Sequence, residues 1–221
     1  MTPENVGQSQ VAICKIVKVV RENDDINTVY LEGVAEQFAG RKAGQFLSVS
    51  MPVADGWSRM HPFTISSAPE EPLLSLTIRK QGEFTSVLPD LKPGTPLKCM
   101  GPLGVFCQDI DSKPFIVMIA GGVGVTPFLS VLRHFRNTEA GNKVKLFWVN
   151  KIIADVFCVD EINEMTNSLD LTVVHCLSRE NDAQRYFQPH YARVRYEKGH
   201  VSADILKRRG VNKDDLVKKS D

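Results

Sequence analysis

The sequence predicts two domains, an antiparallel β-barrel in residues 1–110 followed by an α/β domain with a parallel sheet in residues 111–221. Short apolar runs separated by turn residues fill the first half, which is typical of a barrel. The second half alternates between strand-like and helix-like periodicity, which indicates a parallel sheet with helical crossovers. At 221 residues the chain is long enough for both domains.

Six short strands are expected in the first half, because apolar and β-branched residues cluster there in runs of strand length. Turn signals such as Asp55-Gly56 and Lys92-Pro93-Gly94 separate these runs. One short helix is expected to begin near Phe84. The expected strands cover residues 11–20, 27–31, 46–51, 62–66, 73–79 and 96–100.

The second half begins with six consecutive apolar residues, 115–120, which have the length of a buried parallel strand. Residues 126–135 follow with apolar side chains at helical spacing. Thr126 is expected to cap this helix and Pro127 to occupy its first position. Further strands are expected at residues 144–149 and 171–176, and further helices at residues 159–165 and 201–207.

A glycine turn, residues 121–127 (Gly-Gly-Val-Gly-Val-Thr-Pro), joins that first strand to that first helix. Such a turn lets the backbone approach a pyrophosphate, and the helix start supplies free N–H groups and the positive end of the helix dipole. The turn alone is a weak signal, because a glycine turn can close a strand–helix unit without any ligand.

Three upstream segments strengthen the signal: residues 59–69 (Arg-Met-His-Pro-Phe-Thr-Ile-Ser-Ser-Ala-Pro), 82–88 (Gly-Glu-Phe-Thr-Ser-Val-Leu) and 101–106 (Gly-Pro-Leu-Gly-Val-Phe). In order and spacing, these segments and the glycine turn resemble the ferredoxin–NADP⁺ reductase-like flavoprotein superfamily. The His-Pro-Phe-Thr form is most similar to the flavin domains of ferric reductases and NADPH oxidases. The resemblance runs from about residue 10 to the end of the chain.

The resemblance implies that the first domain binds FAD. An Arg-x-Tyr-Ser or Arg-x-Tyr-Thr segment lies against the flavin in the family, and the matching positions here are His61, Pro62, Phe63 and Thr64. Phe63 would pack on the isoalloxazine, and Thr64 would hydrogen-bond near the reactive N5 as the catalytic residue. His61 stands where the family has arginine, so a bidentate, permanently charged phosphate contact is lost and weaker FAD binding is expected. Arg59 lies nearby but out of register.

Gly82 and the residues after it resemble the family's second phosphate-binding segment. Backbone N–H groups at such a turn can bind an anion. Thr85 is the first expected hydroxyl donor and Ser86 the second, although an ordinary capped helix would use the same residues. Ile78, on the strand before this turn, is also expected at the flavin site.

Gly122, Gly124, Thr126 and Pro127 match the family's Gly-x-Gly-x-x-Pro loop, which implies that they receive the pyrophosphate of NAD(P)H. An acidic residue at the end of the second strand of the α/β domain would favour NADH, because it would bond the ribose 2′-hydroxyl. Residues 148–151 (Trp-Val-Asn-Lys) contain none.

Ser178 and Arg179 stand at the end of the third strand of that domain. In plant-type family members a Ser-Arg pair at this place grips the 2′-phosphate of NADPH, and Arg185 with Tyr186 could add to the contact. The pair also occurs in relatives that use NADH, so both nucleotides stay open. Charge complementarity favours NADPH.

Bulk properties exclude other classes of function. Lys plus Arg (27) balances Asp plus Glu (26), so no global charge favours nucleic acid or a membrane surface. No apolar run approaches the roughly 20 residues that cross a bilayer, and no secretory signal is visible, so a cytoplasmic protein without a membrane span of its own is expected. Five scattered cysteines without C-x-x-C spacing predict reduced thiols rather than a zinc or iron–sulfur site.

The resemblance implies an FAD-dependent oxidoreductase that takes hydride from NAD(P)H to flavin N5. Electrons would then pass to an unidentified acceptor, which could be a ferric chelate, haem, an iron–sulfur protein or free flavin. The His-Pro-Phe-Thr form favours ferric or membrane-haem reductase systems.

Family members continue past residue 221 into a strand, a Cys-Gly-Pro segment, a helix and a last strand, so the α/β domain is expected to be truncated at its C-terminus. Without that strand, residues 115–120 would form an exposed edge, and a fragment is therefore the favoured interpretation. One alternative is a noncatalytic electron-transfer subunit that binds flavin or nucleotide and needs a partner chain. Another is a free-flavin reductase.

Overall fold

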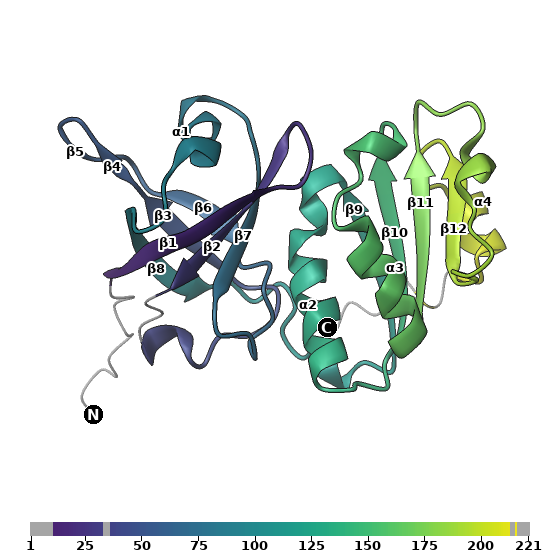
Figure 1. The fold of residues 1–221 in the computed structure, drawn as a ribbon. Coiled ribbons are helices and arrows are strands. Elements are labelled where there is room, and N and C mark those ends of the chain that lie inside the picture. The colour runs from purple at the N-terminus through teal and green to yellow at the C-terminus, as the bar shows by residue number, and fades with distance from the viewer. Residues whose placement is uncertain (1–10, 33–35, 213–214, 216–221) are drawn as a thin grey trace. The chain divides into compact units, whose positions relative to one another are not determined.

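A computed structural model describes residues 11–32, 36–212 and 215 of the chain. The chain divides into two compact units, each with its own main sheet (Figure 1). The first unit comprises residues 1–108 together with 126–134, and the second comprises residues 109–125 together with 135–221.

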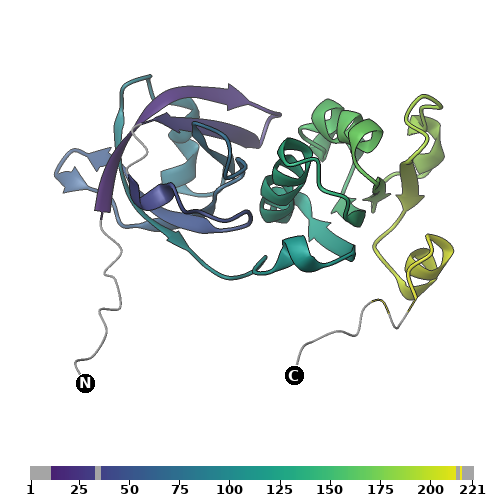
Figure 2. The ribbon, with the colours of Figure 1, turned by 90° about the horizontal axis from the view of Figure 1, so that it is seen from below.

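The first unit is built on an antiparallel sheet of six strands in the order β6-β3-β8-β1-β2-β7, which curls into a half-barrel (Figure 2). This confirms the antiparallel barrel expected from the sequence. A short hairpin, β4 (Pro52–Val53) and β5 (Gly56–Trp57), and a one-turn helix, α1 (Glu83–Ser86), extend from it. The six strands are β1 (Val11–Arg21), β2 (Ile26–Glu32), β3 (Phe46–Ser50), β6 (His61–Thr64), β7 (Leu74–Arg79) and β8 (Pro96–Leu103).

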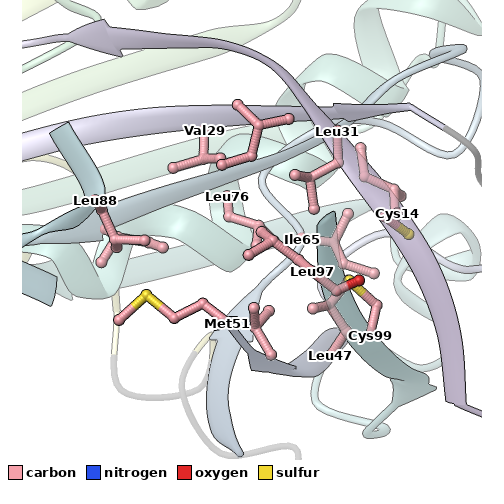
Figure 3. Packing of buried hydrophobic residues seen from close by; sticks show 14 of the residues in the cluster. Cys14, Val29, Leu31, Leu47, Met51, Ile65, Leu76, Leu88, Leu97 and Cys99 are labelled. Carbon is pink, nitrogen blue, oxygen red and sulfur yellow. The ribbon is translucent and has the colours of Figure 1, made fainter. Parts of the chain in front are cut away.

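The inner face of the half-barrel forms the core of the first unit. Alternate residues of β1, such as Cys14 and Ile16, are buried, whereas Ile13 and Lys15, which flank Cys14, are exposed. This alternation is what a sheet with one covered face requires. Figure 3 shows the inward side chains packed together, among them Leu47, Ile65, Leu76 and Leu97.

The second unit is a parallel sheet of four strands in the order β12-β11-β10-β9, as expected for the α/β half. Figure 2 shows the helices α3 (Val159–Ser168) and α4 (Ala203–Arg208) on opposite faces of this sheet. Strand β9 lies at the sheet edge, as expected for residues 115–120. Helix α2 (Thr126–Asn137) follows β9, and its residues 126–134 belong to the first unit. The strands are β9 (Phe115–Gly121), β10 (Lys143–Asn150), β11 (Leu171–Leu177) and β12 (Val194–Lys198).

Three details differ from the sequence-based expectations. A 3₁₀ turn, η4 (Gly122–Val125), precedes α2, so Thr126 is the first helical residue rather than the cap and Pro127 is the second. The short β4–β5 hairpin and β12 were not expected. In β12, charged residues interrupt the apolar pattern, and the carboxylate of Glu197 is buried because Arg208 and Arg209 both donate to it, at 2.8 and 2.7 Å.

Candidate functional site

A hollow of about 800 Å³ in the first unit contains several of the predicted flavin-site residues. His61 of the His-Pro-Phe-Thr strand, Gly82 and Thr85 all line it, although Gly82 lies 21 positions after His61 in the sequence. The other lining residues come from the β4–β5 region and from the turn before and after α1. They are Met51, Pro52, Val53, Ala54, Ser58, Arg59, Gln81, Glu83, Phe84, Val87 and Leu91.

Strand β6 places its four residues on alternate faces. It pairs with β3, with Phe63 opposite Leu47 and Thr64 opposite Phe46. His61 and Phe63 therefore share one face, and Phe63 packs against the barrel core while remaining half-exposed. Pro62 is exposed and lies on an edge strand, where the loss of an N–H donor is tolerated.

Phe84 forms a ring cluster with the two aromatic side chains of β6. Its ring centroid lies 4.1 Å from that of His61 and 5.8 Å from that of Phe63, with the two phenyl planes only 20° apart. From the sequence, Phe84 is expected at the start of a helix and without a contact to the flavin. The signal that could have identified it is a large apolar residue between Gly82 and Thr85, in a turn that is otherwise polar.

The hydroxyl groups after Gly82 bond to their own turn. Thr85 Oγ1 donates to the carbonyl oxygen of Gln81 at 2.7 Å and accepts from the N–H of the same residue at 2.6 Å. Ser86 Oγ donates to the carbonyl oxygen of Gly82 at 2.8 Å. Gly82 has a φ of +82°, and a Cβ added there would meet no atom within 4 Å. Hydrogen bonds within the turn therefore fix its shape, and the space beside Gly82 is open to a ligand.

Two arginines of the first unit carry permanent positive charge. Arg59 lines the hollow, whereas Arg79 does not. Arg79 ends β7, three residues before Gly82, and its buried Nε has no hydrogen-bond partner in the part of the chain that the structure describes. Ile78, the residue before it, is buried in the barrel core. A buried, unsatisfied guanidinium nitrogen is costly unless an anion binds it, so Arg79 fits a phosphate group.

The glycine turn of the second unit has the form expected of a phosphate-binding loop. β9 ends at Gly121, and Gly122 takes the left-handed conformation, with a φ of +50°. A Cβ added at Gly124 would meet no atom within 4 Å. The turn leads directly into Thr126 and Pro127 at the start of α2, so free N–H groups and open space occur together.

The ends of β10 and β11 hold a second group of polar residues. The N–H of Ser178 donates to the carbonyl oxygen of Asn150 at 2.9 Å, and the N–H of Arg179 donates to that of Lys151 at 2.8 Å. Strand pairing therefore continues past the sheet and sets Arg179 beside Lys151. Asn150 is 5 % exposed, and its side-chain nitrogen and oxygen have no partner among the described residues. Ligands of parallel α/β sheets bind at such carboxyl ends.

Arg179 and Arg185 differ in whether their side chains are already engaged by another residue. Arg179 is exposed, and its side chain has no hydrogen bond or ion pair within the described ranges. Arg185 instead donates to a carboxylate oxygen of Glu180 at 3.1 Å, and the hydroxyl of Tyr186 donates to the other oxygen at 3.0 Å. Arg185 and Tyr186 are therefore engaged with Glu180, whereas Arg179 is free to meet an anion.

Among the described residues, the buried titratable groups of the second unit do not gather into a metal centre. Across residues 11–32, 36–212 and 215, no three His, Cys, Asp or Glu side chains gather at one place. Burial lowers the pKa of His175 to about 4 and raises the pKa of the Cys176 thiol to about 11. Both groups are therefore uncharged at neutral pH.

No helix in the described ranges is both long and apolar enough to span a membrane.

Two family profiles match the chain. The one described as an FAD-binding domain covers residues 11–93, and the one described as an oxidoreductase NAD-binding domain covers residues 118–214. The chain belongs to the ferredoxin–NADP⁺ reductase-like flavoprotein superfamily. The first match contains His61, Gly82 and their neighbours, and the second contains the glycine turn and Arg179.

Relatives of this flavoprotein include electron-transfer components and oxidases. The reductase component of propane 2-monooxygenase from Gordonia sp. (strain TY-5) is 30 % identical over 173 residues, which cover 76 % of this chain and 49 % of the relative. NADPH oxidase 1 of Mus musculus is 30 % identical over 176 residues, which cover 74 % of this chain and 28 % of the relative. The flavoprotein chain therefore spans half or less of the length of these relatives.

Solved structures confirm the reductase-like fold. The cytochrome b5 reductase domain of Ulva prolifera nitrate reductase superposes with a TM-score of 0.74 at 19 % identity, over 91 % of this chain and 82 % of that one. A ferredoxin NADP⁺ reductase from Neisseria gonorrhoeae with bound FAD and NADP gives a TM-score of 0.71 at 16 % identity, over 96 % and 81 %. At these identities the likeness establishes the fold.

Proposed function

We propose that this chain is an FAD-dependent oxidoreductase that takes hydride from NAD(P)H and passes electrons to a separate acceptor. The observation that carries the proposal is the hollow in the first unit. It brings together His61, Gly82 and Thr85, which come from two motifs distant in sequence. The open glycine turn before α2 supports the nucleotide half of the proposal.

FAD supplies the redox chemistry when bound, because a flavin accepts hydride and can release electrons singly. The residues of the first unit would bind and orient it. Phe63, with Phe84 beside it, offers an aromatic surface for the isoalloxazine, and Thr64 offers a hydroxyl. Arg79 and Arg59 supply the permanent charge that His61 lacks, and the Gly82 turn adds backbone N–H groups for phosphate.

The second unit would bind the nicotinamide nucleotide. Gly124 leaves room for the pyrophosphate at the start of α2, and Gly122 takes the left-handed conformation just before it. Ser178 and Arg179 suit a 2′-phosphate, and the adjacent Lys151 adds a second positive charge. We therefore favour NADPH as the donor, because neither strand end presents a free carboxylate that would favour NADH.

The acceptor is proposed by chemical class alone. Flavin can release electrons one at a time, so a one-electron centre such as haem, an iron–sulfur protein or a ferric chelate is suitable, and free flavin is a further choice. The names of the relatives include the reductase component of a monooxygenase and an NADPH oxidase.

The cysteines described are free thiols, which agrees with the proposed cytoplasmic location.

An anaerobic titration of the FAD-saturated chain with NADPH, and separately with NADH, tests the proposal. Rapid bleaching of the flavin absorbance by one nucleotide is the expected result and identifies the donor. FAD that binds but is not bleached by either nucleotide would contradict hydride transfer and support the noncatalytic electron-transfer subunit. A chain that binds no FAD at micromolar concentration would contradict the whole proposal.

A further inference from the structure

The indole of Trp148 reaches from the middle of the second unit's sheet to the glycine turn. Its Nε1 donates a hydrogen bond to the backbone carbonyl oxygen of Gly122 at 2.9 Å. Trp148 lies on β10, and Gly122 is the first residue of the 3₁₀ turn that follows β9. The fully buried side chain of Trp148 on β10 is therefore hydrogen-bonded to the turn that follows the neighbouring strand β9.

Trp148 is itself held firmly. The strand register places Ala120 opposite it on β9 and His175 opposite it on β11. The ring of Phe157 meets the indole edge-on, with centroids 5.0 Å apart and planes at 88°. The His175 ring lies 5.8 Å away on the other strand. These contacts and its full burial restrain the indole, so its N–H keeps this direction without a ligand.

The hydrogen bond orients the whole peptide unit between Gly122 and Val123. In a trans peptide the carbonyl and the N–H point in opposite directions. Because the Gly122 oxygen points toward the indole of Trp148, the N–H of Val123 points away from that indole. The first N–H groups of a helical turn have no partner within the turn, so this N–H is available to an anion.

We propose that Trp148 is a positioning residue for pyrophosphate binding by the glycine turn. The inference rests on the proposed function, because the anion would be the pyrophosphate of NAD(P)H. Gly122 contributes through its φ of +50°, which lets its carbonyl turn toward the indole without strain. Trp148 touches no ligand in this arrangement and acts only through the peptide unit that it holds.

The central test compares Trp148→Phe with Phe157→Leu. The first variant removes the indole donor and keeps an aromatic ring, whereas the second loosens the packing on Trp148 and keeps the donor. Binding of ADP-ribose, which carries the pyrophosphate and no nicotinamide, is measured by calorimetry. We expect Trp148→Phe to raise the Kd about tenfold, as the loss of one hydrogen bond in a site would, and Phe157→Leu to change it less than about twofold. If both variants raised the Kd for ADP-ribose equally, Trp148 would act only through packing, and the inference would be overturned.

Hydrogen exchange of the indole N–H provides a readout that needs no ligand. The chain has two tryptophans, and Trp57 is 37 % exposed, so Trp57→Phe assigns the remaining NMR signal to Trp148. We expect that signal to exchange far more slowly than the Trp57 signal, and fast exchange would overturn the inference directly. A wild-type chain with slow exchange but no ADP-ribose binding would instead contradict the proposed function and leave the turn geometry supported. FAD affinity should be unchanged in Trp148→Phe, because the flavin residues belong to the first unit.

Discussion

The guanidinium of Arg133 donates a hydrogen bond to the backbone carbonyl oxygen of Ser66 at 2.8 Å. One helical turn earlier, Ser130 Oγ donates to the carbonyl oxygen of Ser67 at 2.7 Å, and both donors are buried. Ser66 and Ser67 directly follow the His-Pro-Phe-Thr strand and its neighbour Ile65. Residues 126–134 of α2 therefore belong to the same compact unit as the flavin strand and hold the chain just after it.

Arg133→Met is expected to lower the free energy of unfolding by about 2–3 kcal/mol, because it removes a charged donor and leaves the buried Ser66 oxygen unsatisfied. Ser130→Ala removes a neutral donor and should cost about 1 kcal/mol. Arg136→Met serves as the control, since Arg136 is 38 % exposed and its 3.6 Å ion pair with Glu161 should contribute little. Urea denaturation measures all three, and equal losses for Arg133→Met and Arg136→Met would contradict the role given to Arg133.

Phe63→Ala is expected to weaken FAD binding about tenfold, because it removes the aromatic surface on which the isoalloxazine would pack. Phe84→Ala should also weaken binding, since the Phe84 ring supports those of His61 and Phe63. Phe106→Ala is the matched control, because Phe106 is in the same unit, is 69 % exposed and lies outside the hollow. Fluorescence titration with FAD measures the three affinities. An unchanged affinity in Phe63→Ala would exclude the stacking role.

The two-unit fold could be predicted because local sequence and tertiary structure agree in both sheets. Residues 115–120 form a strand whether judged by their apolar run or by their pairing with β10. Strand β12 could not be predicted, because Glu197 looks like a surface residue until Arg208 and Arg209 fold back onto it. Tertiary ion pairing makes the burial of that charge possible.

The candidate site was predictable to the extent that its residues form short motifs. His61, Gly82 and Thr85 were expected together from the family resemblance, and the hollow brings them together. The roles proposed for Phe84 and Arg79 could not be predicted, because they depend on tertiary contacts. The ring of Phe84 matters through its contact with His61, and the Nε of Arg79 matters because it is buried without a partner among the described residues. No spacing rule in the sequence shows either fact.

Gly124→Ala is expected to separate binding from stability. The added Cβ would meet no atom within 4 Å, so the melting temperature should stay within about 1 °C of the wild type. The same methyl group would occupy the space where a pyrophosphate approaches, so the Kd for NADPH should rise at least about tenfold. Gly82→Ala provides the contrast, because its φ of +82° makes any side chain strained and should lower stability as well. An unaltered NADPH affinity in Gly124→Ala would show that the turn does not bind the nucleotide.

Arg179→Ala is expected to reduce the preference for NADPH over NADH. The side chain is exposed and has no partner among the described residues, so its removal should leave stability unchanged. A charged contact to the 2′-phosphate contributes about 1.5–3 kcal/mol, so the Kd for NADPH should rise about tenfold or more while that for NADH stays constant. Lys151→Ala should act in the same direction more weakly, because an ammonium group lacks the bidentate geometry of arginine. Arg185→Ala is the control, since Glu180 already engages that side chain. Equal losses for both nucleotides in Arg179→Ala would contradict 2′-phosphate recognition.

His175 should make the second unit sensitive to acid. Burial lowers the pKa of this imidazole from 6.5 to about 4, and neither ring nitrogen has a hydrogen-bond partner among the described residues. The unfolded chain therefore binds a proton near pH 6.5, whereas the folded chain stays neutral until about pH 4. Stability is complete above about pH 7 and falls by up to about 3 kcal/mol as the pH drops toward 4.

The neighbours of His175 in the sheet strengthen this argument, because none of them supplies a compensating charge. The rings beside it belong to Trp148 and Tyr196, and burial raises the pKa of Tyr196, which keeps that phenol neutral across the acid range. His175→Leu has a similar volume and no titrating group, so it should flatten the acid part of a stability profile measured by urea denaturation between pH 4 and 8. His190→Leu, at an exposed position, is the control and should keep the wild-type slope. Parallel profiles for wild type and His175→Leu would show that carboxylates, and not this histidine, govern the acid sensitivity.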